Sequence, residues 1–479
     1  MARKKRNKVN PDAVVRQLMN IVGEREVLYL KEDLISYECD GYTMTKGMPK
    51  AVVFVKNTEH VSQVVRCLNR ERIPYIARGA GTGLSGGATP LGGEVIISLV
   101  RMKRMLHLDL DNRKAVIEPG FVNLKLTQSI SDKGYYYAPD PSSQYACTIG
   151  GNVAENSGGA HCLKYGVTTN HILGLEIVLP NGEVVEIGED GIPDQPGYDL
   201  LGLLTGSEGT LGIVTKITVK VLKNPEGKKT VLAYYDDIND ASQAVSEIIA
   251  AGIIPAALEM MDSIAIEGVE SAAYPVGHPL DIAAFLLIEV DGIAAGIDDQ
   301  IDEILTVCKH NNVREVKVAK DEAERGLWWA NRKMGFGAMG AISPDYLVQD
   351  GVIPRTRLPE VLIRIAEISK KYDLRIANIF HAGDGNLHPL ILFDARIPGE
   401  SERAAKAGSE CLKVCADVGG SITGEHGVGI EKSAEMRFIF SDEEMAAQTN
   451  IRAVFNPDDL LNPGKLFPQP GRCVEVKQG

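Results

Sequence analysis

The order of apolar and polar positions along the chain predicts an α+β protein. Apolar residues at helical spacing predict helices over residues 12–22 and 59–69. Short apolar runs rich in β-branched residues predict strands at 51–55, 73–77, 95–99, 114–118, 172–179 and 213–221. The sequence Asn224-Pro225-Glu226-Gly227 then interrupts this pattern and indicates a domain boundary.

Beyond this boundary, predicted strands and helices alternate. The strands are expected at 230–235, 254–260, 283–290, 313–318, 375–381 and 388–393. The helices are expected at 239–251, 262–270, 295–311, 320–338, 400–418 and 442–455. This pattern is typical of a sheet covered by helices on one face. We expect one domain over 1–222, a second α+β domain over 223–440, and a segment over 441–479 that packs back on the first.

Charge and composition narrow the possible functions. The net charge of −13 argues against nucleic-acid binding, which needs a basic surface. No stretch approaches the ~20 apolar residues of a membrane span, and no apolar run follows the basic residues Arg3–Arg6. The basic tail is either frayed or a weak anchor to an acidic partner or membrane. The eight cysteines form no C-x-x-C motif, which favours a reducing compartment and excludes common iron–sulfur and zinc spacings.

The first of three glycine clusters follows a predicted strand. Gly81, Gly83 and Gly86 satisfy G-x-G-x-x-G. A dinucleotide-binding fingerprint must also open a helix, and the residues at 88–93 (ATPLGG) cannot form one, so this pattern does not indicate NAD. Consecutive glycines still expose backbone N–H groups that can surround a pyrophosphate. A glycine-rich turn without a ligand is the alternative.

The two other clusters lie at 139–159 and 205–214. Together with the first, they offer many small and polar positions. Such a set is larger than one phosphate needs, and it suits a large flat ligand that lies across several loops.

Long motifs in both halves of the chain resemble one flavoprotein family. RGAGTGLSGG at 78–87, PDPSSQYACTIGGNVAENSGG at 139–159 and TGSEGTLGIVT at 205–215 resemble the FAD-binding domain of the vanillyl-alcohol-oxidase/PCMH family. HAGDGNLHP at 381–389, SITGEHGVGIEK at 421–432 and LNPGKLFP at 461–468 resemble its FAD-linked D-2-hydroxyacid dehydrogenase branch. HCLKYG at 161–166, GIIPAALEMMD at 252–262 and ISPDYLVQDG at 342–351 are most similar to the glycolate-oxidase group.

The resemblance implies a fold and an activity. The fold is a PCMH-type FAD-binding domain of two α+β subdomains, with an α+β cap (substrate) domain that carries a metal site. The activity is oxidation of a small 2-hydroxy acid, glycolate or D-lactate, to the 2-oxo acid. FAD is expected to bind non-covalently, although His161 and Cys162 are possible tethers. The implied FAD-binding residues are Arg78, Gly79, Ala80, Gly81, Thr82, Gly83, Gly87, Pro139, Asp140, Thr148, Gly150, Gly151, Asn152, Ala154, Ser157, Gly158, Glu208, Gly209, Gly212, Ile213 and Asn462.

A metal site is indicated by the spacing of two histidines. If Asp384-Gly385 forms a two-residue hairpin turn, His381 pairs directly with His388 and both imidazoles lie on one face. One added carboxylate would make a site with open positions, and Glu425 is the natural candidate because flanking glycines let it and His426 reach one cavity. A packed histidine pair without metal is the alternative.

The resemblance assigns roles to this group of residues. His381, His388 and Glu425 bind a divalent metal (zinc, manganese or iron), and His426 is the base that takes the hydroxyl proton before hydride transfer to flavin N5. Arg332 matches the arginine that pairs with the substrate carboxylate. Relatives that act on 2-hydroxyglutarate carry a lysine at the position where Val348 aligns. The absence of this lysine here fits a small monocarboxylate as the substrate.

The route of the electrons is open. The expected acceptor is a quinone, a dye-like carrier, oxygen, or a partner such as an iron–sulfur subunit or electron-transfer flavoprotein. We expect a cytoplasmic protein, peripheral to the membrane through a partner at most. Other possible functions are a metallohydrolase built on the histidine–glutamate group, an FAD-containing electron-relay subunit, and a 2-hydroxyglutarate-type dehydrogenase.

Overall fold

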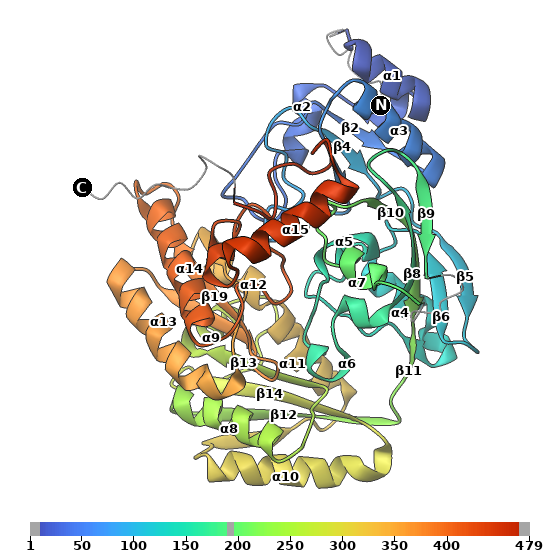
Figure 1. Cartoon of the computed structure of the whole chain (residues 1–479). Coiled ribbons are helices and arrows are strands. Elements are labelled where there is room, and N and C mark those ends of the chain that lie inside the picture. Colours follow the sequence, from blue (N-terminus) through green and yellow to red (C-terminus); the bar gives the residue numbers. More distant parts are fainter. Residues whose placement is uncertain (1–9, 189–195, 469–479) are drawn as a thin grey trace, which may run out of the picture.

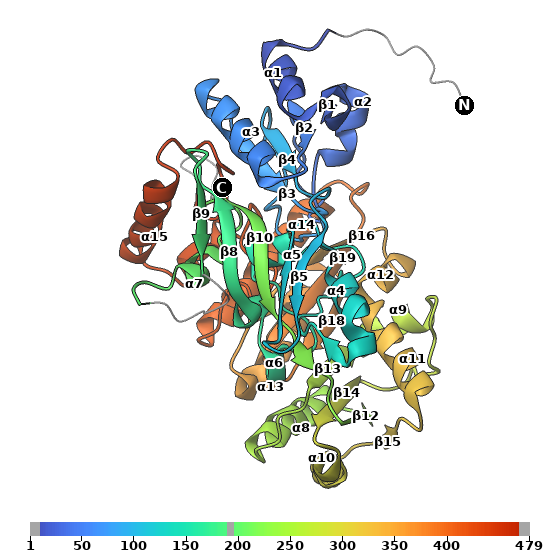
Figure 2. The same cartoon turned by 90° about the vertical axis from the view of Figure 1, so that its right-hand side faces the viewer.

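The computed structural model describes residues 10–188 and 196–468, and three sheets organise the chain (Figure 1). The basic residues Arg3–Arg6 and Cys473 lie outside the described residues. In Figure 2 the first sheet lies at the top near α1, the second in the middle and much of the third below it. No helix among the described residues is long and apolar enough to cross a membrane.

The first sheet has four strands in the order β1-β2-β4-β3. Its strands β2, β4 and β3 are parallel and almost wholly buried, and the helix between β2 and β3 has a buried apolar face. The strands are β1 (Val27–Leu28), β2 (Ala51–Phe54), β3 (Tyr75–Arg78) and β4 (Val95–Ser98), and the helices α1 (Ala13–Val22), α2 (Lys31–Leu34) and α3 (Thr58–Arg70). The chain leaves β3 directly into the first glycine cluster, which is not helical, as predicted.

The second sheet is antiparallel, with five strands in the order β5-β6-β10-β8-β9. Its strands are β5 (Met105–Asp109), β6 (Lys114–Ile117), β8 (Ile172–Val178), β9 (Val184–Ile187) and β10 (Ile213–Lys220). The helices α4 (Asn123–Ile130), α5 (Ile149–Glu155) and α7 (Leu200–Leu204) contribute to its core. A small ribbon joins β7 (Tyr135–Tyr136) to β11 (Leu222–Lys223).

Helix α5 lies inside the second glycine cluster, where we expected a loop. It forms despite Gly150 and Gly151 because Thr148 caps it, its hydroxyl accepting a hydrogen bond from the Gly151 N–H. Ile149 and Val153 anchor the helix in the core of the second sheet.

The third sheet has eight strands, in the order β15-β12-β14-β13-β18-β19-β16 with β17 paired to β19. They are β12 (Gly227–Tyr235), β13 (Ala257–Asp262), β14 (Ala284–Gly292), β15 (Glu315–Val318), β16 (Asp345–Val348), β17 (Gly351–Val352), β18 (Ile376–His381) and β19 (Asn386–Phe393). The accompanying helices are α8 (Ile238–Ala250), α9 (Ser263–Glu270), α10 (Ile297–His310), α11 (Glu322–Lys333), α12 (Gly335–Ala338), α13 (Leu358–Tyr372) and α14 (Glu400–Asp417).

The expectation that helices cover only one face of this sheet is wrong. Val231, Ala233 and Tyr235 of β12 pack in one core cluster with residues of α8, α10, α13 and α14. Leu232 and Tyr234 point the opposite way, into a second cluster with α9 and α11. Because both faces are buried, the central strands are continuous apolar runs instead of alternating ones.

The predicted register of the histidine hairpin is also wrong. His381 pairs with Asn386, and His388 pairs with Ile379, because a four-residue turn over 382–385 replaces the expected two-residue one. The observed register differs from the predicted one by two residues, an even number, so His381 and His388 remain on one face of the sheet. The predicted helix over 320–338 is likewise divided into α11 and α12.

The last described segment of the chain returns to the first sheet. The backbone N–H of Tyr75 donates to the Leu460 carbonyl at 2.8 Å, and the Asn462 N–H donates to the Tyr75 carbonyl at 2.8 Å. Leu460 and Leu461 are part of the first sheet's core, and Phe455 at the end of α15 (Asp442–Phe455) packs on the second. Residues 455–462 therefore pack against the first two sheets.

Candidate active site

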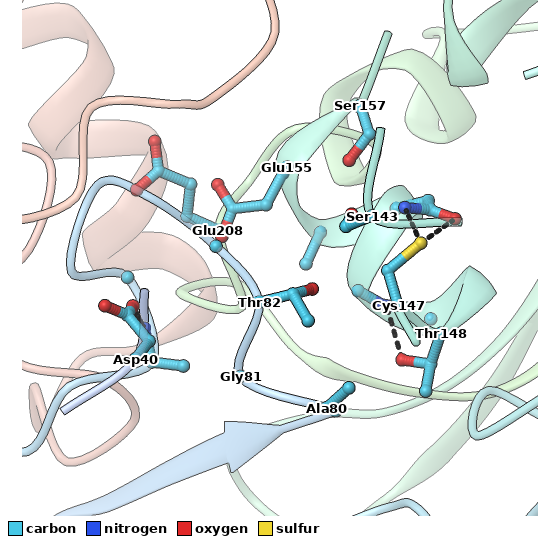
Figure 3. Close-up of a pocket in the computed structure, with 18 of the residues that line it drawn as sticks. Asp40, Ala80, Gly81, Thr82, Ser143, Cys147, Thr148, Glu155, Ser157 and Glu208 are labelled. Atoms are coloured by element: carbon cyan, nitrogen blue, oxygen red, sulfur yellow. Dashed lines mark hydrogen bonds between the residues drawn. The ribbon is translucent and has the colours of Figure 1, made fainter. Parts of the chain in front are cut away.

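One cavity extends from the three glycine clusters to the third sheet. Figure 3 shows the side of this cavity that the glycine clusters line. Residues of the first cluster, the start and end of α5, and the third cluster line most of it. Lys333, Phe336, Tyr346, Val348, Glu425 and His426 line it from the third-sheet side. The cavity thus joins the predicted cofactor loops to part of the predicted metal and proton-transfer group.

The glycines shape this cavity in two ways. Gly81 has a φ of +73°, and a Cβ there would lie 2.3 Å from the Arg78 guanidinium, which is itself held by the carbonyls of Cys39 and Ala88. Gly209 has a φ of +64°, and a Cβ there would meet nothing within 4 Å. A side chain at Gly209 would therefore extend into open space of the cavity, as expected of a cradle for a large ligand. These loops fit a bound FAD.

The structure brings the predicted FAD residues together, with four exceptions. Pro139, Asp140, Gly158 and Asn462 do not line the cavity. The Asn462 amide instead donates to the carbonyls of Gly87 and Glu208, so it ties two of the clusters together. Pro139 accepts from the Asn123 amide, and Asp140 binds His161 and Lys333. Gly158 lets the Glu425 carboxylate approach, because its Cβ would lie 2.6 Å from Glu425 Oε2.

Some lining residues carried no recognisable signal in the sequence. Asp40 lies on the first-cluster side of the cavity, where its carboxylate accepts from the N–H groups of Tyr42 and Ala88. Asp40 belongs to none of the motifs that indicated the cofactor loops. The possible flavin tethers His161 and Cys162 do not line the cavity.

His381, His388 and Glu425 converge at one point. Glu425 Oε1 lies 3.1 Å from His381 Nε2 and 3.0 Å from His388 Nε2. The two imidazole rings are 5.1 Å apart and perpendicular. The pKa of Glu425 is held well below its usual value: burial opposes this, but the two histidines outweigh it.

The outer ring nitrogens of both histidines face acceptors. His381 Nδ1 lies 2.8 Å from Glu259 Oε1, and His388 Nδ1 lies 3.3 Å from the Gln349 carbonyl. Burial disfavours the charge on His381, but Glu259 and Glu425 outweigh it and raise its pKa well above the usual value, so without a metal a proton on Nε2 joins this ring to Glu425. With a metal in place of that proton, a ring that keeps its proton on Nδ1 presents the lone pair of Nε2 as a ligand. This donor set and its outer partners fit a divalent metal.

His426 follows Glu425 and lies at the edge of the cavity. Its ring stacks on that of His388, with centroids 4.8 Å apart and an angle of 10° between planes. Burial lowers the pKa of His426 to about 4, although the negative charge of Asp350 opposes the shift. Its Nδ1 is buried without a hydrogen-bond partner among the described residues. A neutral imidazole with an available nitrogen is suited to accept a proton.

Arg332 lies behind the metal-ligand candidates and does not line the cavity. Its side chain is 4% exposed and forms an ion pair with Glu259, the carboxylate that also holds His381 Nδ1. The sequence predicted that Arg332 binds the substrate carboxylate, but the structure does not place its side chain in the cavity wall. Its neighbour Lys333 lines the cavity instead.

Comparisons with known proteins identify the family. Residues 49–188 match the FAD binding domain family, and residues 224–466 match the C-terminal domain of FAD linked oxidases. The chain is 47% identical to the glycolate oxidase subunit GlcD of Escherichia coli K12, with 98% of this chain and 93% of that one covered. It is 33% identical to a D-lactate dehydrogenase of Anaerostipes hadrus, with 96% and 98% covered.

Solved structures show the same fold at low sequence identity. A p-cresol methylhydroxylase with bound substrate superposes with a TM-score of 0.80 at 18% identity, over 95% of this chain and 96% of that one. The 4-ethylphenol oxidase of Gulosibacter chungangensis gives 0.79 at 19% identity, over 95% and 97%. The fold is the predicted PCMH-type FAD-binding fold. The chain thus belongs to the FAD linked oxidase family, as an FAD-linked hydroxyacid oxidoreductase of the group that contains the GlcD subunits and D-lactate dehydrogenases.

Proposed function

We propose that the protein oxidises glycolate or D-lactate to the 2-oxo acid, with FAD held by the glycine clusters and a divalent metal held by His381, His388 and Glu425. The observation that carries this proposal is the convergence of both Nε2 atoms on Glu425 Oε1 beside a cavity that His426 lines. When bound, FAD supplies the hydride acceptor and the metal supplies the positive charge that acidifies a hydroxyl group.

The chain's own residues then have three tasks. Glu259 and the Gln349 carbonyl keep a proton on each Nδ1, so that both Nε2 atoms stay available as ligands. His426, neutral near pH 7, takes the proton of the substrate hydroxyl. Phe336, Tyr346 and Val348 form a mainly apolar wall of the cavity, which suits the hydrogen of glycolate or the methyl group of D-lactate.

The electrons are proposed to leave through a partner. The sequence has no C-x-x-C motif to carry an iron–sulfur centre. Its relatives named GlcD are described as subunits of glycolate oxidase. An iron–sulfur subunit, an electron-transfer flavoprotein or a quinone would complete the reaction here.

An anaerobic absorption spectrum tests this function. The FAD-loaded protein is mixed in turn with glycolate, D-lactate, L-lactate and D-2-hydroxyglutarate. We expect loss of the flavin band with glycolate or D-lactate, and loss of that response after metal removal by a chelator. Bleaching by D-2-hydroxyglutarate alone would instead assign the dicarboxylate. A flavin that none of these acids reduces would assign an electron-relay role.

A further inference from the structure

Three carboxyl groups line the cavity where the glycine clusters meet the loop that carries His426. Glu155 ends α5, Glu208 belongs to the third glycine cluster, and Asp40 lies on the first-cluster side. Figure 3 shows the side chain of Glu155 reaching from α5 toward that of Glu208. A Cβ at Gly427 would lie 2.4 Å from Glu155 Oε2 and 2.8 Å from Glu208 Oε1. The carboxyl groups of Glu155 and Glu208 therefore face the same point.

The carboxylates of Glu208 and Asp40 are held by backbone N–H groups. Glu208 accepts from the Val428 N–H at 2.6 Å and from the Gly429 N–H at 2.7 Å. Asp40 likewise accepts from two N–H groups, one at each oxygen. Burial raises the pKa of Glu208, but the two N–H donors act against this shift because they favour the charged form. Glu208 is therefore the member of the pair that is equipped to carry the negative charge.

Glu155 has no donor of this kind. Its Oε2 is buried without a hydrogen-bond partner among the described residues. Burial raises the pKa of Glu155 well above its usual value, and the charges of Glu208 and Asp40 add to the shift. The Lys432 ammonium opposes them, but it donates to the Gly427 carbonyl at 2.9 Å. Because adjacent buried carboxyl groups resist carrying two charges, the proton of the pair belongs to Glu155.

A protonated carboxyl group offers an O–H donor, and Glu155 offers it within the cavity that fits FAD. The side chain lies between the first glycine cluster and the His426 loop. A Cβ at Gly87 would lie 2.9 Å from Glu155 Oε1, whereas one at Gly427, next to His426, would lie 2.4 Å from Oε2. In the proposed reaction His426 takes the hydroxyl proton of the substrate that reduces the flavin, so the flavin ring belongs beside this loop.

We propose that Glu155 stays protonated beside the charged Glu208 and donates a hydrogen bond to an acceptor atom of the flavin ring. This inference rests on the proposed function, which places FAD in this cavity and the ring beside His426. Reduction adds electron density to the acceptor atoms of the ring, so the donor stabilises the reduced form more than the oxidised one. The charge of Glu208 keeps the proton on Glu155 at a pH where an isolated acid loses it.

The test compares FAD-loaded E155Q and E155L with the wild type. Glutamine keeps an N–H donor and has no proton to lose, whereas leucine removes the donor. We expect E155L to bind FAD roughly 3- to 10-fold more weakly, as for one hydrogen bond, and to have a lowered midpoint potential. E155Q should keep the wild-type affinity and potential at neutral pH. E303L, at an exposed position of α10, is the matched control and should equal the wild type in both measurements.

The pH dependence separates a neutral acid from a carboxylate. As the pH rises through the raised pKa of Glu155, the wild type should lose FAD affinity relative to E155Q, because the carboxylate no longer donates. Infrared difference spectra between the chemically reduced and oxidised protein give a second measurement, which does not depend on the folding of E155L. We expect a carboxylic-acid C=O band that shifts in D2O and is absent from E155Q.

The outcomes distinguish this inference from the proposed function. Wild-type FAD affinity and potential in E155L would overturn the inference, as would a wild type without the carboxylic-acid band. Weaker FAD binding with an unchanged potential would place Glu155 at the pyrophosphate or the ribityl chain and overturn its assignment to the ring. A protein that takes up no FAD would overturn both proposals. All these measurements use chemical reduction, so a flavin that no 2-hydroxy acid reduces would count against the proposed substrate alone.

Discussion

The carboxylate of Asp350 holds the backbone of His426. Asp350 Oδ2 lies 2.9 Å from the His426 nitrogen and 3.0 Å from the Gly424 nitrogen, and it accepts from the Thr423 hydroxyl at 2.6 Å. Asp350 is fully buried, and although burial raises its pKa, nearby groups that include the Lys432 ammonium hold it well below the usual value. A single carboxylate therefore fixes the loop that carries both Glu425 and His426.

Replacing Asp350 by Asn should impair the reaction more than FAD binding. The amide keeps one acceptor oxygen but loses the charge opposite Lys432, so we expect destabilisation of about 3 kcal/mol and a fall in kcat of roughly 10- to 100-fold, since misplaced groups react slowly. Flavin content, thermal unfolding and anaerobic flavin reduction measure the three effects. D299N, at an exposed position of α10, is the control. A D350N protein with wild-type kcat would show that this carboxylate does not position the loop for catalysis.

His426→Ala should abolish reduction of the flavin by substrate while FAD remains bound. The imidazole is the neutral base at the cavity edge, whereas the glycine clusters hold the cofactor. We expect a yellow protein whose flavin reduction is slowed by at least about 10²-fold, the usual contribution of a general base. Stopped-flow spectroscopy with saturating glycolate or D-lactate measures the rate. Bleaching at the wild-type rate would remove His426 from the mechanism.

Removal of Glu425 should release the metal. Glu425→Gln keeps the size of the side chain but removes its negative charge, so the two imidazoles lose their anionic partner and metal affinity should fall by at least about 10-fold. Elemental analysis of the purified protein should give about one divalent ion per chain in the wild type and much less in E425Q. E402Q, at an exposed position of α14, should match the wild type. Equal metal content in all three proteins would contradict the assignment.

Gly209→Val should block FAD binding. The backbone at Gly209 has a φ of +64°, and a side chain there would extend into the cavity. Gly277→Val is the matched control, because Gly277 has a φ of +80°, also with nothing within 4 Å, but lies outside the cavity. Both substitutions introduce strain of about 1–2 kcal/mol. Only G209V should lose flavin absorbance, and retention of FAD by G209V would place the cofactor elsewhere.

Local sequence patterns predicted the cofactor-binding loops well, but they did not predict which groups the charged side chains contact. Most FAD-binding candidates line one cavity, because small residues in long clusters leave room for a ligand whatever the details of the turns. Arg332 differs, because its orientation depends on Glu259, which is over seventy residues away in sequence and reaches it only through the packing of α11 on the third sheet. No local pattern encodes such a contact.

The register of the hairpin between β18 and β19 was also not predictable from local sequence. Asp384-Gly385 favours a two-residue turn, yet the turn has four residues because long-range contacts fix it. The Gly383 N–H donates to the Leu258 carbonyl of β13, and the Ile353 N–H donates to the Gly385 carbonyl. Contacts with neighbouring segments therefore determine the register in which β18 pairs with β19. The true register differs from the predicted one by two residues, so His381 and His388 still lie on the same face of the sheet. The convergence of the two histidines could therefore be predicted, although their pairing could not.

The His161–Asp140 pair should make the stability of the protein depend on pH. Burial alone would lower the pKa of His161, but Asp140 and Glu289 raise it to about 10, compared with ~6.5 for an unfolded histidine. The folded protein therefore holds this proton more tightly than the unfolded chain. The resulting stabilisation is fully present below about pH 6.5, decreases above it, and is lost as the pH rises through about 10.

Chemical unfolding of the FAD-loaded protein at pH 6.5 and 9.5 measures this effect. We expect the free energy of unfolding to fall by roughly 1–3 kcal/mol across this range, a value discounted for the cost of burying the pair. His161→Gln should be less stable at pH 6.5 and should show a smaller fall. His107→Gln, at an exposed position of β5, should keep the wild-type dependence. If H161Q retained the full fall, the pH dependence would belong to other groups, and His161 would not be the cation that shares Asp140 with Lys333.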